Sequence, residues 1–401
     1  MQLRRVHRVN SAFAAIPLTY FSMKSVQGLI FVLGAFASQV SLAQNSDTTN
    51  PYPDIPNPFR QTPAKIENTG KNLAVDVIQL TSLPTHTEPP VVTAISVSPN
   101  GEFIAAAGDD HAIRIVELAT GKTTATLIGH LDWVQSVEFS PDGLQLASCG
   151  NDGALCVWSL SPKPKLTSKK IADHALMTLA FIDNESLCTA GFGNRIYRSD
   201  ASSRELTLMH TCECRDIRSI VVSPDRTLIA FGGRDGILRV RRVNADETSH
   251  ANEIVEQLHF DRIRMLQFST DGNQITSVGE DRRIVHYDLV NRTTIGQTEI
   301  GVGKLLGLCQ LDTHLFAISS SDNTIRVFSD YDQQVHSRLV GHDGSVSILK
   351  RTQKHLISGS FDTTIRIWDI DKAIASVGTQ GRYVHPVAAQ FEDSGAANEV
   401  K

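Results

Sequence analysis

A short pattern recurs along this chain at a nearly constant interval. The segment SGSFDTTIRIWDID, Ser358 to Asp371, places an Asp six residues before a Trp, and ASCGNDGALCVWS repeats this spacing. Aligned on the Asp, the copies are separated by 42, 41, 42, 46, 41 and 40 residues, at Asp110, Asp152, Gly193, Asp235, Asp281, Asp322 and Asp362. A period of about 40–45 residues is the length of one four-stranded propeller blade.

A second element recurs in phase with the first. The phrases VSPNGEFIAAAGDD, FSPDGLQLASCGND, VSPDRTLIAFGGRD and FSTDGNQITSVGED each precede one Asp of the ladder. Their shared S-P-D-G element is flanked by alternating apolar and β-branched residues, which predicts a turn between two antiparallel strands.

With these motifs the chain resembles the WD-repeat family over seven repeats from about Val91 to Asp371. The resemblance implies an all-β, seven-bladed WD-repeat β-propeller of four-stranded antiparallel blades, closed by an N-terminal strand paired into the last blade. The apolar run LAVDVIQLTSL, Leu73 to Leu83, stands where that closing strand is expected. Closure would remove two exposed sheet edges. The fold supports many unrelated functions.

The N-terminal 43 residues have the pattern of a secretory signal peptide. Four basic residues and no acid precede or flank the apolar run GLIFVLGAFA, and Ser41 and Ala43 form a small-x-small site before Gln44. The basic lead is long, so Met23 is a second candidate for the true start. An uncleaved N-terminal anchor is the alternative. We therefore expect an exported protein, in the periplasm, at the cell surface or secreted.

The predicted domain organisation follows from composition. Residues 1–43 form the signal peptide, 44–72 a Pro-rich disordered linker, 73–371 the propeller and 372–401 a disordered tail with a short strand near Val387. Removing residues 1–43 changes the formal net charge from −5 to −9. An acidic mature chain is poorly suited to nucleic acid, so we expect protein or peptide partners, and contact with a membrane only through the signal or anchor.

The repeats carry His, Ser, Asp and an aromatic residue at set spacings that resemble a catalytic triad. The family resemblance implies a structural tetrad instead, in which the indole N–H bonds the Ser, the Ser bonds the His and the His bonds the Asp. A satisfied buried network of this kind specifies one geometry. The tetrads are His130, Ser148, Asp152 and Trp158; His259, Ser277, Asp281 and Tyr287; and His342, Ser358, Asp362 and Trp368.

Four blades depart from this tetrad. The Ser and Trp positions hold Ala106 and Val116 in blade one, Phe231 and Arg241 in blade four, and Ile318 and Phe328 in blade six, while blade three has Gly193 and Ser199.

The cysteines do not predict a metal site. Cys212 and Cys214 follow His210, but no second Cys/His cluster follows at zinc-ligand spacing. Cys149 and Cys156 flank an NDG turn and are expected to face each other across a hairpin, either as buried thiols or as a bridge in an oxidising compartment. Sequence motifs for phosphate cofactors are incomplete or missing, so no cofactor is expected.

The most favoured function is non-catalytic binding of proteins or peptides by one propeller face. A binding domain for cell-wall sugar and an enzyme with its site at the central channel are the alternatives. The family resemblance places two positions of each blade at the channel entrance. The first set is Asp109, Asn151, Phe192, Arg234, Glu280, Ser321 and Phe361; the second is Val91, Trp133, Ala175, Asp216, Arg262, Lys304 and Ser345.

These two sets divide into an apolar arc on blades seven, one, two and three and a charged arc on blades four to six. An apolar centre with a polar border is typical of a binding hot spot. Trp133 and Phe361 are the strongest candidates for partner contacts, and packing of these aromatics against neighbouring loops is the alternative.

Overall fold

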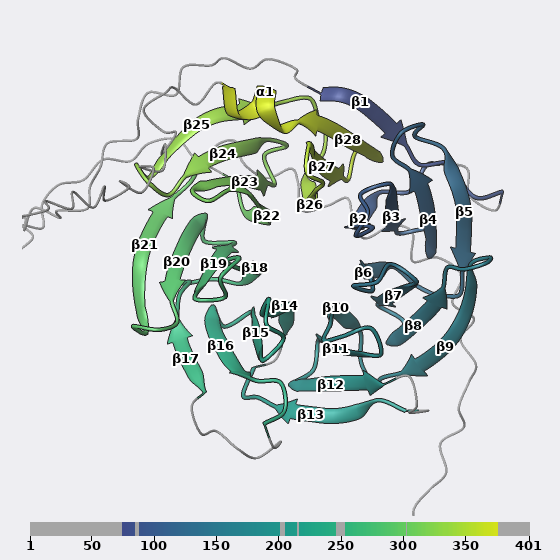
Figure 1. Ribbon diagram of the computed structural model, residues 1–401, viewed down its shortest axis with the longest axis horizontal. Coiled ribbons are helices and arrows are strands. Elements are labelled where there is room, and N and C mark those ends of the chain that lie inside the picture. The colour runs from purple at the N-terminus through teal and green to yellow at the C-terminus, as the bar shows by residue number, and fades with distance from the viewer. Residues whose placement is uncertain are drawn as a thin grey trace, which may run out of the picture. The chain divides into compact units, whose positions relative to one another are not determined.

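A computed structural model describes residues 74–375 except 85–87, 201–204, 215, 246–252 and 302. These residues form a ring of seven four-stranded antiparallel sheets around a central channel (Figure 1). The predicted fold class, an all-β seven-bladed propeller, is confirmed. The predicted signal peptide, the linker, Val387 and Leu73 lie outside the described residues. In the described part of the chain, no helix combines the length and apolar character needed to cross a bilayer.

Each blade uses its strands in chain order from the channel outward. The strands of blades one to four are β2 (Val92–Val97), β3 (Phe103–Gly108), β4 (Ala112–Glu117) and β5 (Thr123–Ile128); β6 (Val134–Phe139), β7 (Gln145–Gly150), β8 (Ala154–Ser159) and β9 (Lys165–Ile171); β10 (Leu176–Phe181), β11 (Ser186–Gly191), β12 (Arg195–Asp200) and β13 (Thr207–Thr211); and β14 (Ile217–Val222), β15 (Leu228–Gly233), β16 (Ile237–Arg242) and β17 (Ile254–Gln257).

The remaining blades follow the same order, with one exception in the last. Their strands are β18 (Ile263–Phe268), β19 (Gln274–Gly279), β20 (Arg283–Asp288) and β21 (Thr293–Glu299); β22 (Leu305–Asp312), β23 (Leu315–Ser320), β24 (Ile325–Ser329) and β25 (Gln334–Leu339); and β26 (Val346–Arg351), β27 (His355–Ser360), β28 (Thr364–Asp369) and the N-terminal β1 (Ala74–Gln79).

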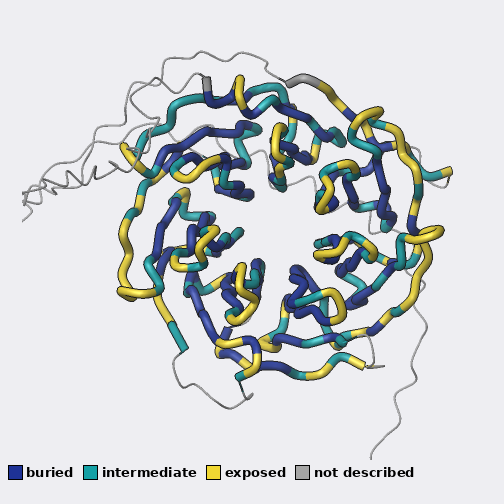
Figure 2. The backbone as a smooth tube through the Cα atoms, viewed as in Figure 1, coloured by how far each residue is buried: buried dark blue, intermediate teal, exposed yellow. Residues whose placement is uncertain are grey.

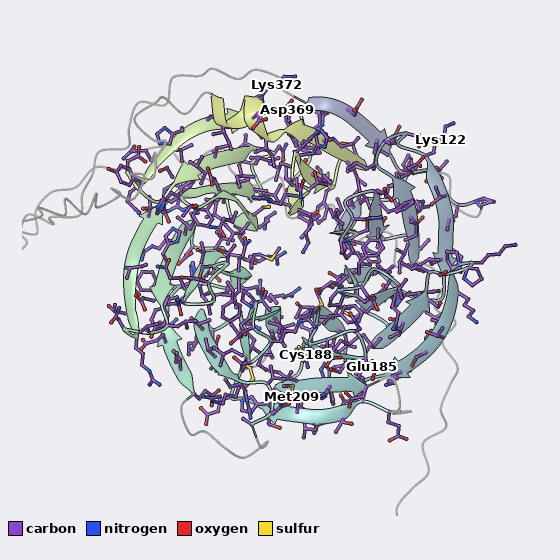
Figure 3. The ribbon with its side chains drawn as sticks, in the orientation of Figure 1. Lys122, Glu185, Cys188, Met209, Asp369 and Lys372 are labelled. Carbon is purple, nitrogen blue, oxygen red and sulfur yellow. A yellow bond between two sulfur atoms is a disulfide. The ribbon has the colours of Figure 1, made fainter. Side chains whose placement is uncertain are left out.

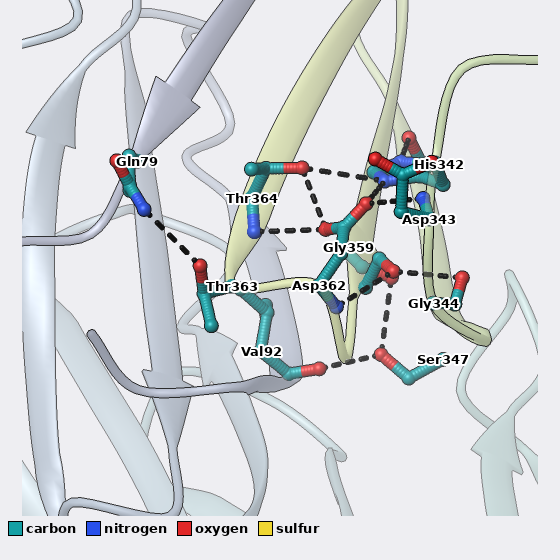
Figure 4. Close-up of polar contacts among 12 residues, drawn as sticks. Gln79, Val92, His342, Asp343, Gly344, Ser347, Gly359, Asp362, Thr363 and Thr364 are labelled. Atoms are coloured by element: carbon teal, nitrogen blue, oxygen red, sulfur yellow. Dashed lines mark hydrogen bonds and ion pairs between the residues drawn. The ribbon is translucent and has the colours of Figure 1, made fainter. Parts of the chain in front are cut away.

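Blade seven takes its outer strand from the other end of the chain. Strand β1 pairs antiparallel with β28, from Ala74 opposite Trp368 to Gln79 opposite Thr364. The Gln79 amide also donates to the Thr363 hydroxyl at 3.3 Å (Figure 4). Because Ile78, in β1, and Leu80, just after it, are buried against blades one and seven, this strand covers the edge of β28 with apolar contact as well as backbone bonds.

In most blades burial is greatest in the second and third strands and least in the outer strand. Figure 2 shows the inner strands mostly buried and the outer strands mostly exposed. Apolar side chains of neighbouring blades form shared clusters, such as the one between blades three and four that contains Cys188 and Met209 (Figure 3). Each blade has apolar residues on both faces of its sheet, and both faces must be covered. The stability of every blade therefore depends on its two neighbours.

Hydrogen bonds join the innermost strands of neighbouring blades. The Thr93 hydroxyl donates to the Val134 carbonyl at 2.5 Å, and the Ser347 hydroxyl donates to the Val92 carbonyl at 2.6 Å across the closure (Figure 4). The amides of Phe139, Ile220, Leu266 and Gln310 each donate to a side-chain oxygen of the preceding blade. These bonds fix the positions of the inner strands around the channel.

The predicted S-P-D-G turns join the first and second strands of blades one, two, four and five. In blade two the Ser140 hydroxyl donates to Asp142 at 2.6 Å and accepts from the Gln145 amide at 2.9 Å. Gly143 adopts φ +72°, a conformation that favours glycine, and Arg226 takes the same place in blade four at φ +61°.

Helix α1 (Ile370–Ala375) follows β28 and extends four residues into the segment predicted as a disordered tail. Ile370, Ala373 and Ile374 are buried in a cluster with Trp368. Figure 3 labels Lys372 and Asp369, whose charged groups lie 3.6 Å apart at the start of this helix. Burial of an apolar face therefore orders these residues despite their polar surroundings in the sequence.

Candidate functional site

The two predicted sets of rim positions are joined by hydrogen bonds at one end of the channel. In six blades the residue before the repeat Asp position donates its backbone N–H to the carbonyl of the residue before the first strand. The pairs, at 2.9–3.0 Å, are Asn151 and Trp133, Phe192 and Ala175, Arg234 and Asp216, Glu280 and Arg262, Ser321 and Lys304, and Phe361 and Ser345. In blade one the Asp109 carboxylate accepts from the Val91 amide at 2.9 Å. Both positions of each blade are therefore held on one rim.

Three aromatic side chains of this rim are substantially exposed. Trp133 is 41% exposed, Phe361 48% and Phe192 49%. Two further apolar side chains, Leu131 and Phe260, lie in loops at the same end of the blades, each 78% exposed. A gathering of large exposed apolar side chains at one end of a rigid ring is typical of an interaction surface.

A cavity of about 350 Å³ lies in the channel at the level of the inner strands, and all seven blades contribute to its lining. Trp133 and Phe361 line it together with the charged side chains of Arg218, Arg264 and Lys350. Glu138 also lines it: burial raises the pKa of this carboxyl to about 7, although Lys350 and the Phe181 amide favour its charged form. The cavity is therefore bordered by both aromatic and cationic groups.

Six side chains of blades four to six form a continuous ionic network on the rim, which we call the cationic cluster: Asp216, Arg218, Arg262, Arg264, Glu280 and Lys304. Arg262 joins the two carboxylates, at 3.1 Å from Asp216 and 2.8 Å from Glu280. Of the other predicted rim residues, Arg234 is exposed and Asn151 accepts a hydrogen bond from Gln135 at 3.1 Å. Four members of this network are predicted rim positions, whereas Arg218 and Arg264, which lie one residue inside their strands, were not predicted.

The tetrads of blades two and seven have nearly the same geometry. In blade two Trp158 donates to the Ser148 hydroxyl at 2.9 Å, and His130 lies 2.8 Å from Ser148 and 3.0 Å from Asp152. The corresponding distances for Trp368, Ser358, His342 and Asp362 are all 2.8 Å. Because a carboxylate only accepts, His Nδ1 carries a proton in both tetrads and donates it to the Asp.

Burial alone would raise the pKa of Asp152, but bonds from His130 and the Leu131 amide lower it to about 2. The Asp152 carboxylate is therefore charged near neutral pH and accepts hydrogen bonds from both His130 and the Leu131 amide. In blade five His259 lies 2.8 Å from both Ser277 and Asp281, and the buried Tyr287 takes the place of the Trp. All three Ser hydroxyls lie on fully buried residues.

Three blades without the tetrad His use an Arg instead, which sequence analysis missed. Asp110 pairs with Arg114 at 2.5 Å, Asp235 pairs with Arg239 at 2.8 Å, and Asp322 pairs with Arg326. In each case the Arg follows the Asp by four residues, so both lie at the same end of one strand. The D-x-x-x-R spacing recurs in these three blades and was the available signal, although blade seven carries it too, at Asp362 and Arg366, together with its His.

The cysteines occupy different positions from those expected. The strand register places Cys149 opposite Leu155 and Cys156 opposite Ser148, so these two cysteines do not face each other. Both are free and buried, and burial raises the pKa of Cys156 to about 12. Cys212 and Cys214 are joined by a disulfide. Within the described ranges, no group of three or more His, Cys, Asp or Glu residues has an arrangement that could hold a metal ion.

Comparison with known proteins identifies four repeats in this chain. The family model described as "WD domain, G-beta repeat" matches residues 78–117, 121–159, 206–241 and 333–369. The matched segments run from an outer strand of one blade through the three inner strands of the next. The sequence repeat is therefore offset by one strand from the structural blade, which is why the ring closes with β1.

The relatives found are similar to this chain at low identity. The ribosome biogenesis protein YTM1 of Saccharomyces cerevisiae is 27% identical over 314 residues, which cover 70% of this chain and 65% of that protein. The corresponding protein of Schizosaccharomyces pombe is 26% identical, over 63% of this chain and 67% of its own length. Apoptotic protease-activating factor 1 of Danio rerio is 24% identical, over 62% of this chain and 19% of its length. The chain thus spans less than two thirds of the length of the Saccharomyces cerevisiae and Danio rerio proteins.

The comparisons correct the predicted localisation. The yeast relatives are named for ribosome biogenesis, a process of the cell interior, and nothing in the comparisons indicates export. The prediction of an exported protein is therefore wrong. A basic start followed by a short apolar run is a compositional pattern, and it does not by itself identify a segment that directs export.

Proposed function

Because this chain is a WD-repeat seven-bladed β-propeller, we propose that it is a non-catalytic scaffold that binds a protein or peptide partner at its docking face. The docking face is the rim around the channel mouth that carries Trp133, Phe192 and Phe361. The exposure of these three aromatic side chains on one rim is the observation that carries the proposal. Trp and other aromatics are the side chains that most often dominate binding energy at protein interfaces.

The backbone that presents these aromatics supports the proposal. The Asn151 amide donates to the Trp133 carbonyl, and the Phe361 amide donates to the Ser345 carbonyl. These bonds fasten the loops at the ends of the inner strands, which are themselves tied from blade to blade. A rigid surface loses little conformational entropy when it binds, so a modest set of contacts gives measurable affinity.

The buried state of the tetrads argues against catalysis by their Ser, His and Asp groups. The Ser148 oxygen already accepts a bond from Trp158, and Ser148 has no exposed surface. A substrate carbonyl could not reach this oxygen without unfolding the blade. The same holds for Ser358 in blade seven. These groups therefore support the proposed structural role, in which each network stabilises one blade.

The test is a comparison of partners bound by the wild type and by the double variant Trp133→Ala with Phe361→Ala. The control is Leu144→Ala with Tyr331→Ala, which removes two side chains, 57% and 60% exposed, from the opposite ends of the strands. The folded chains are immobilised, and bound proteins are quantified by mass spectrometry from an extract and from isolated ribosome-assembly particles, because the relatives carry that name.

We expect the docking-face variant to lose at least one partner that both the wild type and the control retain. Matching thermal melts of the three chains would show that the loss comes from the surface and not from unfolding. Retention of every wild-type partner at unchanged affinity by the docking-face variant would overturn the proposal.

A further inference from the structure

We propose that the docking face binds an acidic peptide segment, whose carboxylates contact the cationic cluster and whose apolar side chain lies on Trp133 and Phe361. This inference rests on the proposed function and specifies the chemistry of the partner. The juxtaposition of excess positive charge and exposed aromatic rings at one cavity carries it.

The carboxylates of the cationic cluster are already engaged by its cations. Asp216 lies 2.7 Å from Arg218 and 3.1 Å from Arg262. Glu280 lies 2.8 Å from Arg262, 3.6 Å from Arg264 and 2.5 Å from Lys304. The side chains of the two carboxylates are only 4% and 7% exposed, so a partner approaching this surface meets the cations first.

The cluster has more positive than negative charge. Four cations surround two carboxylates, in a chain whose formal net charge is −5. The Lys304 side chain is 57% exposed and the Arg264 side chain 29%. Burial and the nearby Arg218 lower the pKa of Arg264, whereas Glu280 and Asp216 raise the pKa of Arg262 despite its burial. Because the cations outnumber the carboxylates, the cluster is complementary to an incoming negative charge.

The cationic cluster is continuous with the aromatic part of the docking face. The Arg218 guanidinium lies over the Phe192 ring, 4.7 Å from its centre. Arg218 and Arg264 also line the cavity that Trp133 and Phe361 line from the other side. One short peptide can therefore contact an aromatic side chain and a cation at the same time. Such a pairing of an apolar anchor with charge complementarity gives both affinity and specificity.

A protein segment fits this surface better than a nucleic acid does. A nucleic acid requires a basic track that follows several phosphates, whereas the cluster is confined to three blades and two carboxylates neutralise half of it. The rings could stack on bases, so a single-stranded nucleic acid is included as a competing ligand in the test.

The test is a selection of random twelve-residue peptides displayed on phage against the immobilised full chain. Selected peptides are resynthesised with a fluorescent label, and their binding is measured by anisotropy to the wild type, Lys304→Glu and Lys372→Glu. Lys372 is the matched control because it is 64% exposed and lies on α1, outside the cluster. A labelled twenty-residue oligo(dT) is measured in parallel.

We expect the selected peptides to be enriched in Asp and Glu around one aromatic or apolar residue. Their affinity should fall about tenfold or more for Lys304→Glu and stay within about twofold for Lys372→Glu. It should also weaken when NaCl is raised from about 50 to about 500 mM, because salt screens exposed charges.

Three results would overturn this inference: peptides without acidic enrichment, equal binding by Lys304→Glu and the wild type, or displacement of the selected peptides by oligo(dT). If the selected peptides are neutral or basic, and the Trp133→Ala, Phe361→Ala variant does not bind them, the proposed docking face stands but its ligand is not acidic. Selected peptides that bind this double variant as well as the wild type would contradict both the inference and the proposed function.

Discussion

The guanidinium of Arg218 covers the ring of Phe192, with its central carbon 4.7 Å from the ring centre. The two residues belong to different blades, since Phe192 follows β11 and Arg218 lies in β14, and only Phe192 is one of the predicted rim positions. Their contact joins the apolar arc to the charged arc, which the sequence presents as two separate groups. A partner that binds one group therefore lies against the other.

Replacing Trp368 by Ala should lower the free energy of unfolding by about 3–5 kcal/mol, as truncation of buried aromatics generally does. Trp368 has no exposed surface, and its indole donates to Ser358 at 2.8 Å. The exposed Ser161→Ala is the control and should remain within about 0.5 kcal/mol of the wild type. Denaturant unfolding curves measure both, and curves that coincide would contradict the structural role of Trp368.

Replacing Arg114 by Met should cost about 3–5 kcal/mol, because it leaves the buried Asp110 carboxylate without its ionic partner. Arg114 is 1% exposed and also donates to the Thr81 carbonyl. Adding Asp110→Asn to Arg114→Met should recover part of the loss. The exposed pair of Arg195 and Asp173 is the comparison, and Arg195→Met should lower the free energy of unfolding much less, because water screens exposed ion pairs. Equal losses at the two sites in urea unfolding would contradict this prediction.

Removal of β1 should destabilise the ring, whereas removal of the segment before it should not. Deletion of residues 44–68 leaves β1 in place, but deletion of residues 44–84 exposes the edge of β28 and removes Ile78 and Leu80 from the core. We expect the longer deletion to lower the melting temperature or to cause aggregation. Calorimetry and light scattering measure this, and equal stability of the two chains would show that β1 does not close the propeller.

Replacing Glu138 by Gln should stabilise the protein at pH 8 more than at pH 4.5. Burial raises the pKa of Glu138 to about 7 in the folded chain, from 4.5. The unfolded chain therefore releases this proton at lower pH than the folded chain, so the wild type loses stability as the pH rises from 4.5 to 7. Because the Glu138 side chain is only partly buried, we expect a gain of about 1–2 kcal/mol at pH 8 rather than the full value of the shift.

The control for this pH effect is Glu185→Gln, which removes an exposed carboxylate. The change between the two pH values for Glu138→Gln is compared with the change for this control. A difference for Glu138→Gln that does not change with pH would show that this carboxyl titrates alike in the folded and unfolded chains. Denaturant unfolding at the two pH values provides the measurement.

The amino-acid sequence by itself was sufficient to predict the blades, because strands and turns depend on residues close together in the chain. Alternation of apolar residues, the S-P-D-G turns and the Asp ladder recur within each repeat, and the sheets follow them. The spacing from His130 to Trp158 likewise determines which four side chains can meet inside one blade. The two rim positions of each blade were predicted from the resemblance to the WD-repeat family, and both lie next to the ends of strands.

The contacts between blades were decided only by the tertiary structure. Asp216 and Lys304 lie far apart in the sequence, and the ring brings them to Arg262 and Glu280 of the blade between them. The raised pKa of Glu138 depends on the inner strands that surround it in the channel. Register also separated Cys149 from Cys156, which were expected to face each other. The local sequence pattern therefore determines the single blade. Which side chains of different blades meet is determined by the packing of the blades around a closed ring, because those contacts join distant parts of the chain.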